Sequence, residues 1–394
     1  MTSSPRRRAG PVPLLSAGHA CVDVYQGSIA ALVPFFVAER AYPYAAAAGL
    51  VLAASLLSSV AQPLFGVLTD RWAMPWLLPV STLAGGVGVA LCGLTDQYAP
   101  TLVVVAFSGL GVAAYHPEAA RVARIAGRGS HTSMGWFSLG GNLGFATSPL
   151  LVSAVVATGG LAASPLLVLP AVAGALLSTA ALRSMKRRTP PGAGASRVSP
   201  GRDDWASFAR LSGAIACRSV VFVGLGTFLA LYAPERVGGG AAVGAAALFV
   251  LYLGGAVGTV AGGRLATRFG RLRVVRWSYA LTAPAVAGIV FVPGPALFVF
   301  AAATSIGLSV PFSLHITLGQ DYLPRRPGTA SGVTLGLAVS VGGVAGPLIG
   351  ALADSTSLHT ALTPLIALPG LGRLVLRPLR EPARPEDRAG PVEG

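Results

Sequence analysis

Residues 183–204 read RSMKRRTPPGAGASRVSPGRDD, a polar and basic stretch rich in Pro, Gly and Ser. This composition is typical of a flexible linker. On both sides of it the chain consists of apolar segments of about twenty residues, the length that crosses ~30 Å of hydrocarbon at ~1.5 Å per residue. The stretch therefore divides a membrane-spanning chain into two parts.

Each part contains six predicted membrane-spanning helices. Their ranges are 14–38, 45–68, 76–94, 100–119, 132–157, 161–182, 208–233, 241–265, 274–292, 295–318, 329–353 and 357–378. The sequence thus predicts an all-α membrane protein with twelve transmembrane helices in two pseudo-symmetric six-helix halves. The predicted domains are an N-terminal half (1–183), a cytoplasmic linker (184–206), a C-terminal half (207–380) and a disordered tail (381–394).

The composition and charge agree with a membrane protein. Charged residues make up 11% of the 394 residues and hydrophobic residues 53%, whereas a soluble domain carries about 25% charged residues. If the N-terminus is cytoplasmic, 26 of the 29 Lys and Arg residues lie in the inner segments, two lie in the outer segments, and Arg218 lies within a span. This asymmetry places both termini in the cytoplasm and the chain in the inner membrane. The net charge of +15 is then a sign of topology, and we expect no nucleic-acid partner.

The two halves resemble each other weakly. Gly66 and Arg71, after the second span, correspond to Gly263 and Arg268, after the eighth, at a displacement of 197. Three further matches between the fifth and eleventh spans have a displacement of 198: Ser133 with Ser331, Gly144 with Gly342, and Pro149 with Pro347. Parallel repeats of this kind place a substrate site at the interface of the halves, near the middle of the bilayer.

These residues resemble the major facilitator superfamily. Gly66-Val-Leu-Thr-Asp70-Arg71 is similar to the front of its signature between helices 2 and 3, although Trp72-Ala73-Met74 lacks the usual Gly and trailing bases. Within the superfamily, the chain resembles the fosmidomycin resistance protein family. The most specific stretch is His116-Pro117-Glu118-Ala119-Ala120-Arg121-Val122-Ala123-Arg124. Further support comes from Gly18-His19 with Asp23 and Gln26, from Gly140-Gly141-Asn142, and from Arg218-Ser219. The resemblance implies proton-driven drug efflux.

Asp23 is the first candidate for proton coupling. It lies near the bilayer centre, where a carboxylate costs about 2.5–3.5 kcal/mol on insertion scales and normally faces a cavity or a partner. It is either a proton-carrying carboxylate or a structural hydrogen-bonding group. His19, one turn earlier, could relay a proton or could simply be packed. Glu118 is a third proton-coupling candidate, although its spacing from Arg121 also suits an ion pair at an inner gate.

Arg218 is the main candidate for substrate binding. It lies at a depth similar to that of Asp23 on the equivalent helix of the other half, so the two could form a switchable pair or a permanent salt bridge. Its guanidinium could also hold a phosphonate or carboxylate bidentately. The further substrate-binding candidates are Gln26, His116 and Asn142.

A separate group of residues suits conformational change. The Asp70-Arg71 pair, on a predicted tight inner loop, could hold helix ends together in one state and release them in the other. Gly66, Arg121 and Arg268 complete the predicted gate.

The sequence therefore predicts a proton-coupled transporter, an efflux antiporter of a small drug-like or anionic molecule, and not an enzyme. Its expected partners are a small-molecule substrate, protons and the lipid bilayer, and it is expected to act as a monomer. An importer or facilitator with the same fold is the alternative, followed by a membrane-embedded enzyme or a sensor. There is no Walker sequence and no Cys/His cluster with metal-ligand spacing, so neither a cofactor nor a metal site is expected.

Overall fold

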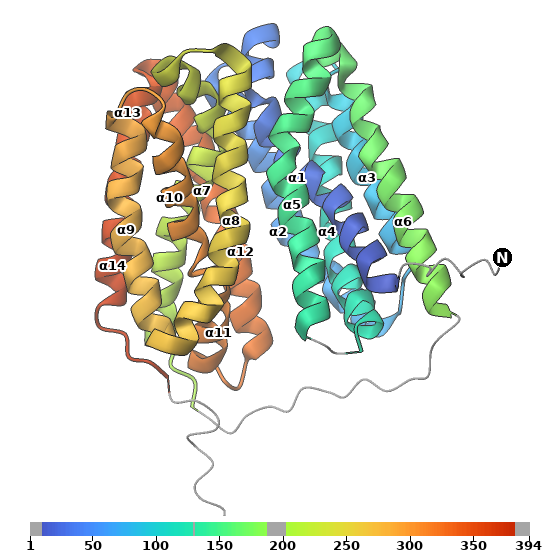
Figure 1. Cartoon of the computed structure of the whole chain (residues 1–394), viewed down its shortest axis with the longest axis vertical. Helices are drawn as coiled ribbons and strands as arrows, with labels where there is room; N and C mark the ends of the chain where they lie inside the picture. Colours follow the sequence, from blue (N-terminus) through green and yellow to red (C-terminus); the bar gives the residue numbers. More distant parts are fainter. Residues whose placement is uncertain (1–9, 129–130, 187–201, 383–394) are drawn as a thin grey trace, which may run out of the picture.

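The computed structural model describes residues 10–128, 131–186 and 202–382. Every regular element in these residues is a helix, and the helices form two groups that lie side by side (Figure 1). Residues 187–201 of the predicted linker and 383–394 of the predicted tail lie outside the described residues. Helices are the expected elements because a chain in hydrocarbon must satisfy each backbone N–H and C=O internally.

Residues 10–186 form the N-terminal half. Its elements are α1 (Pro11–Arg40), α2 (Tyr44–Arg71), α3 (Leu77–Cys92), α4 (Tyr98–Ala126), α5 (His131–Gly159), the 3₁₀ helix η1 (Gly160–Val168) and α6 (Leu169–Lys186).

Residues 202–382 form the C-terminal half. Its elements are α7 (Trp205–Val237), α8 (Gly240–Phe269), α9 (Arg271–Phe291), α10 (Ala296–Ser309), α11 (Phe312–Tyr322), α12 (Pro327–Ser355), α13 (Leu358–Leu362), the 3₁₀ helix η2 (Thr363–Ile366) and α14 (Ala367–Leu376). Asp204 begins α7 by accepting a hydrogen bond from Ser207 N–H at 3.0 Å, and this bond lowers the pKa of the Asp204 carboxyl group.

These elements make the twelve predicted crossings. Ten helical segments in the described residues are long and apolar enough to cross a membrane. One of them, Ser133–Met185, contains two crossings because it joins α5 to α6 through η1, and the shorter apolar helix Leu77–Cys92 adds another.

Three crossings are interrupted where the sequence analysis predicts unbroken helices. Pro311 lies between α10 and α11, Pro364 lies in η2, and Pro165 lies in η1. Proline has no N–H to donate and its ring collides with the preceding turn, so each interruption falls at a residue that weakens the helix.

The predicted inner loops also differ from the structure. Asp70 and Arg71 belong to the last turn of α2, so the prediction of a tight loop at these two residues is wrong. Arg268 belongs to the last turn of α8. Helix α2 continues past Pro63 and Gly66 to Arg71, and α8 ends only at Gly270, whose φ of +84° suits glycine.

The repeat between the halves has a clear structural role. A Cβ atom at Gly144 of α5 would collide with the Ala20 carbonyl of α1, and one at Gly342 of α12 would collide with the Ser219 carbonyl of α7. Both glycines therefore allow two helix backbones to approach closely, as small residues do in membrane bundles. The Gly144–Gly342 match found in the sequence marks the same packing contact in each half.

The halves meet at the end of the bundle opposite the linker, here called the far end. Tyr44 N–H and Ala45 N–H, at the start of α2, donate to the two carboxylate oxygens of Asp354 at the end of α12, at 2.8 and 3.0 Å. A Cβ atom at Gly350 would lie 2.6 Å from Ala45 N, which shows how closely the two helices approach there.

The same two helices separate towards the other end, here called the linker end. A Cβ atom at Gly66 of α2 or at Gly332 or Gly336 of α12 would have no heavy atom within 4 Å beyond its own helix and chain neighbours. The larger cluster of buried apolar residues draws on both halves, whereas the second cluster lies within residues 208–379. The bundle is therefore closed between its halves at the far end and more open towards the linker.

Candidate functional site

A cavity of about 510 Å³ lies between the halves, within the size range of small-molecule sites. Helices α1, α2, α4 and α5 line it from one half, and α7, α8 and α12 from the other. Gln62 and Pro63 of α2 and Gly332 of α12 belong to its lining near the linker end. The site therefore lies where the repeat predicts a substrate site.

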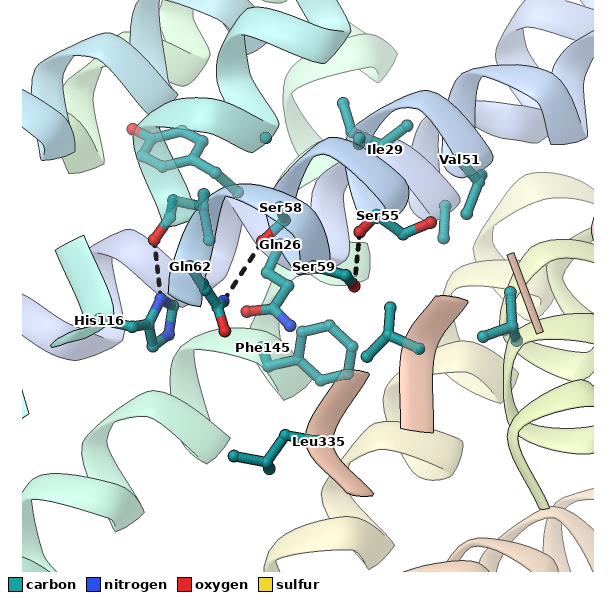
Figure 2. A pocket seen from close by; sticks show the side chains of 18 of the residues that line it. Gln26, Ile29, Val51, Ser55, Ser58, Ser59, Gln62, His116, Phe145 and Leu335 are labelled. Atoms are coloured by element: carbon teal, nitrogen blue, oxygen red, sulfur yellow. Dashed lines mark hydrogen bonds between the residues drawn. The ribbon is translucent and has the colours of Figure 1, made fainter. Parts of the chain in front are cut away.

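One wall of the cavity is a polar stripe on α2, formed by Ser55, Ser58, Ser59 and Gln62. These positions are spaced i, i+3, i+4 and i+7, so they share one helix face. Figure 2 shows them beside Gln26 of α1, whose side chain is exposed in the cavity. Gln62 Nε2 donates to Ser58 Oγ at 3.3 Å, and Ser59 Oγ donates to the Ser55 carbonyl at 2.9 Å.

The opposite wall is aromatic and joins the halves. The rings of Phe145 (α5) and Tyr252 (α8) have centroids 4.1 Å apart, and the ring of Phe222 (α7) lies 6.4 and 6.3 Å from them. All three residues line the cavity. Figure 2 shows Phe145 and Leu335 across the cavity from the α2 stripe.

A cluster of three ionisable side chains adjoins this cavity, here called the His–Asp–His cluster: His19 and Asp23 of α1 and His116 of α4. Asp23 Oδ1 lies 3.1 Å from His116 Nε2, and Asp23 Oδ2 lies 3.3 Å from His19 Nε2. Asp23 is 9% exposed and His19 7% exposed, whereas His116 also lines the cavity. Gly141 of α5 gives them room, because a Cβ atom there would lie 2.5 Å from Asp23 Oδ2.

The backbone fixes the orientation of both imidazoles. His19 Nδ1 lies 2.9 Å from the Phe137 carbonyl oxygen, and His116 Nδ1 lies 2.8 Å from the Val112 carbonyl oxygen. A carbonyl oxygen can only accept, so each Nδ1 carries a proton and donates it. Each Nε2 therefore faces the Asp23 carboxylate.

This arrangement requires at least one additional proton. If both imidazoles were neutral, each Nε2 would direct a lone pair at an ionised carboxylate oxygen. One proton on His116 Nε2 turns the 3.1 Å contact into a hydrogen bond and makes the cluster neutral. The buried His19 Nε2 makes no hydrogen bond within the described residues, but it lies 3.3 Å from Asp23 Oδ2 and can hold a second proton there. The cluster can thus take up and release protons inside the bundle.

The same three side chains are of the types that bind transition metals. Their ligand atoms all lie within 4.8 Å of one another, and they form the one such group of three or more in the described residues. The sequence predicts no metal site, since it contains no Cys/His cluster with metal-ligand spacing. The cluster supplies three ligand atoms, one fewer than a closed structural zinc site.

Glu118 and Arg121 form a bidentate ion pair on α4. Arg121 Nε donates to Glu118 Oε2 at 2.8 Å and Arg121 Nη2 donates to Glu118 Oε1. Glu118 is fully buried and does not line the cavity. This contact corresponds to the ion pair that the sequence analysis weighs against a proton-transfer role for Glu118.

Arg218 does not contact Asp23 in this structure. Its Nε donates to the Leu308 carbonyl of α10, and its guanidinium carbon lies 5.6 Å from the Phe222 ring and 5.3 Å from the Phe312 ring. Arg218 is 5% exposed and does not line the cavity. The carboxylate that was expected to face Arg218 is instead held by the two histidines.

The remaining predicted residues lie outside the cavity or at the linker end. Asn142 is half-buried on α5 and is not part of the cavity lining. Arg71 and Arg268 are exposed at the ends of α2 and α8. Asp70 lies in α2, and its side chain is outside the described part of the structure.

Sequence reasoning missed two parts of the site. The partnership of His116 with Asp23 joins residues 93 positions apart, and nothing in the spacing signals it. The α2 stripe could have been found, because four polar residues at helical spacing within an apolar span form a recognisable pattern.

The comparisons with known proteins agree with this architecture. Residues 15–385 match the family model of the Major Facilitator Superfamily. The chain is similar to the fosmidomycin resistance protein of Escherichia coli (strain K12), with 27% identity over 385 residues covering 95% of this chain and 94% of that protein. It is also similar to the uncharacterised MFS-type transporter YfnC of Bacillus subtilis (strain 168), with 29% identity over 373 residues covering 90% and 89% of the two chains.

Solved structures share the fold at low sequence identity. A bacterial homologue of the human lysosomal transporter Spinster, in an inward-facing and occupied conformation, gives a TM-score of 0.73 at 15% identity and covers 97% of this chain and 98% of that one. The Escherichia coli fucose:proton symporter gives a TM-score of 0.61 at 15% identity and covers 93% and 98%.

Proposed function

Because the chain belongs to the Major Facilitator Superfamily, a family of transporters rather than enzymes, we propose that it is a proton-coupled exporter of a small drug-like molecule. It acts as a monomer in the inner membrane, with both termini in the cytoplasm, and it exchanges protons for substrate by alternating access. The observation that carries the proposal is the His–Asp–His cluster beside the cavity.

The coupling follows from the position of His116. The His116 side chain lines the cavity, and its Nε2 atom also contacts the Asp23 carboxylate. A substrate that displaces His116 from Asp23 changes the number of protons the cluster holds. Because binding linkage is reciprocal, protons then change the affinity for substrate by the same factor.

Alternating access requires contacts that can break at either end. In this structure the far end is closed by the Asp354 contact with Tyr44 and Ala45, while α2 and α12 separate towards the linker end. We assign this arrangement to the inward-facing state. The predicted gate at Gly66, Asp70, Arg71, Arg121 and Arg268 would close the linker end in the opposite state.

The direction of transport is supported by the Escherichia coli relative, whose name records resistance to fosmidomycin. That name makes fosmidomycin the first drug to test on this chain. The alternative is uptake, and the fold shared with a fucose:proton symporter favours it, since that protein couples its substrate to protons by symport.

The test uses inverted membrane vesicles that contain the protein and hold an imposed proton gradient. A fluorescent pH indicator inside the vesicles follows the response to fosmidomycin and to a panel of unrelated drugs. Antiport predicts a substrate-dependent release of protons from the vesicle interior. We expect Asp23→Asn, which keeps the shape of the side chain but cannot titrate, to reduce this release to background.

The matched control is Asp96→Asn, because Asp96 is a carboxylate whose side chain is 95% exposed, away from the cluster. The measurements are repeated in EDTA to exclude a metal ion at the cluster as the source of the signal. Proton movement into the vesicle lumen on substrate addition would indicate symport. Undiminished coupling in Asp23→Asn would remove Asp23 from the mechanism.

A further inference from the structure

We propose that the cavity binds an uncharged molecule that combines a planar ring with N–H or O–H donors. This proposal rests on the transport function proposed above and names the substrate class of the same site. It differs from the anionic substrate that the sequence analysis considers. Three features of the cavity lead to it.

The first feature is the charge of the lining. The described residues that line the cavity include no Arg, Lys, Asp or Glu, and His116 is the one histidine among them. An ion without a counter-ion loses its hydration on entering such a site and gains no charged partner in return. Both the Asp23 carboxylate and the Arg218 guanidinium lie behind other side chains: Asp23 behind His116, and Arg218 against the rings of Phe222 and Phe312.

The second feature is the direction of the hydrogen bonds. Ser55 and Ser59 of the α2 stripe line the cavity, and each hydroxyl donates its proton to a backbone carbonyl, that of Leu52 and Ser55 respectively. Each hydroxyl oxygen can then only accept from a ligand. A phosphonate or carboxylate needs donors, and of the three serines in the stripe Ser58, whose hydroxyl accepts from Gln62 Nε2, keeps a proton to donate. The balance of the serine hydroxyls therefore favours N–H and O–H groups on the ligand.

The third feature is the pair of surfaces that the ligand would touch. The rings of Phe145, Tyr252 and Phe222 offer an apolar face on which a planar ring can stack. The amide of Gln26 is exposed in the cavity and can both donate and accept. A molecule with a ring on one side and hydroxyl or amide groups on the other satisfies both walls.

The experiment compares ligands that differ only in charge. The probe is tritiated chloramphenicol, which has a nitrophenyl ring, two hydroxyl groups and an amide N–H and carries no charge. Equilibrium binding to the purified full-length protein is measured in detergent at pH 7. The competitors are chloramphenicol hemisuccinate, which carries a carboxylate, its uncharged methyl ester, and fosmidomycin. We expect the methyl ester to compete at least about tenfold better than the acid, and fosmidomycin not to compete.

A charge placed in the wall should reverse this preference. Leu335 of α12 lines the cavity and is 42% exposed. In Leu335→Lys, we expect the acid to compete better than its methyl ester. Leu335→Gln, of similar length and without charge, is the matched control and should keep the original preference.

Binding of the acid or of fosmidomycin as tight as that of the methyl ester would overturn the proposal, and so would failure of chloramphenicol to bind. The vesicle assay separates the two hypotheses. Proton release driven by fosmidomycin, with an anion preference in binding, would keep the transport function and overturn the substrate class. The expected binding preference without any proton-linked transport would keep the class and overturn the function.

Discussion

His19 and His116 hold the same carboxylate but differ in what lies on their other side. His116 lines the cavity, whereas His19 is buried against Phe137, with ring centroids 4.2 Å apart. Because only His116 lies between substrate and Asp23, we expect His116→Gln to abolish the proton release that substrate binding causes. His19→Gln removes the second proton site, so it should lower the number of protons released per substrate without abolishing the release. A pH indicator in solution with the purified protein measures both.

His359→Gln is the matched control for these variants. His359 contacts the Tyr232 hydroxyl at 3.0 Å and does not line the cavity, so its loss should leave proton release intact. If His19→Gln stopped the release and His116→Gln did not, the proposed route from substrate to Asp23 would be wrong.

Arg218 is positioned by contacts that lysine cannot reproduce. Its Nε donates to the Leu308 carbonyl, and its planar guanidinium lies near two aromatic rings. We expect Arg218→Lys to destabilise the protein by about 1–3 kcal/mol and to leave the ratio of affinities for chloramphenicol hemisuccinate and its methyl ester unchanged. Thermal unfolding and the binding assay test the two parts. A loss confined to the acid would instead support the anion-binding role predicted from the sequence.

The sequence predicts those properties of a residue that depend on its position along one helix, and not its contacts with other helices. The depth of Asp23 in its span follows from counting residues, and the sequence analysis therefore selects it. Its partners depend on how α1 packs against α4 and α5, and the depth of the residues alone predicts Arg218 as the partner instead of His116. Glu118 and Arg121 lie on one helix, and for them the spacing alone predicts the ion pair that the structure shows.

At the scale of helices, the contact between Asp354 of α12 and the start of α2 closes the far end, and a single substitution can weaken it. Tyr44 N–H and Ala45 N–H, which have no partner within α2, donate to the Asp354 carboxylate. Both these hydrogen bonds and the helix dipole favour a negative charge there. Asp354→Asn keeps the shape and removes the charge. We expect the closed far end to lose about 1 kcal/mol, which shifts the balance of the two access states towards the outward-facing one by roughly fivefold.

Alkylation of a cysteine in the cavity measures this balance. In a variant whose native cysteines (Cys21, Cys92 and Cys217) are replaced by alanine, Gln26→Cys supplies the target. A membrane-impermeant maleimide added outside should react about fivefold faster when Asp354→Asn is present. Asp96→Asn, an exposed carboxylate at the same end, should leave the rate unchanged. An unchanged rate in Asp354→Asn would show that the contact does not control access.

Helix number was predictable and helix continuity was not. Twelve apolar segments follow from hydropathy because each must span the same thickness. The interruptions at Pro165, Pro311 and Pro364 depend on which prolines the neighbouring helices can accommodate, since Pro34, Pro63 and Pro117 lie inside unbroken helices. The sequence locates the residues that could interrupt a helix and leaves the choice among them to packing.

At the scale of the whole molecule, the repeat predicts the packing of the halves and the position of the site, and the charge asymmetry predicts the orientation in the membrane. The Gly144–Gly342 match predicts equivalent packing in the two halves, and the structure shows a close helix contact at each glycine. The repeat also predicts a site between the halves, where the cavity lies. The chemistry of that site could not follow from symmetry, because the His–Asp–His cluster belongs to one half alone.

The orientation of the molecule in the membrane is a prediction from the charge distribution. It determines whether this structure is the inward-facing or the outward-facing state. The sequence assigns 26 of 29 basic residues to predicted inner segments, and the described inner segments lie at the linker end, so that end should face the cytoplasm. In the variant without native cysteines, we expect Asp96→Cys at the far end to react with an impermeant maleimide in intact cells. Thr267→Cys, exposed near the linker end of α8, should react only after the membrane is permeabilised. The opposite result would place the linker end outside the cell and would reassign this structure from the inward-facing to the outward-facing state, together with the expected effect of Asp354→Asn on access.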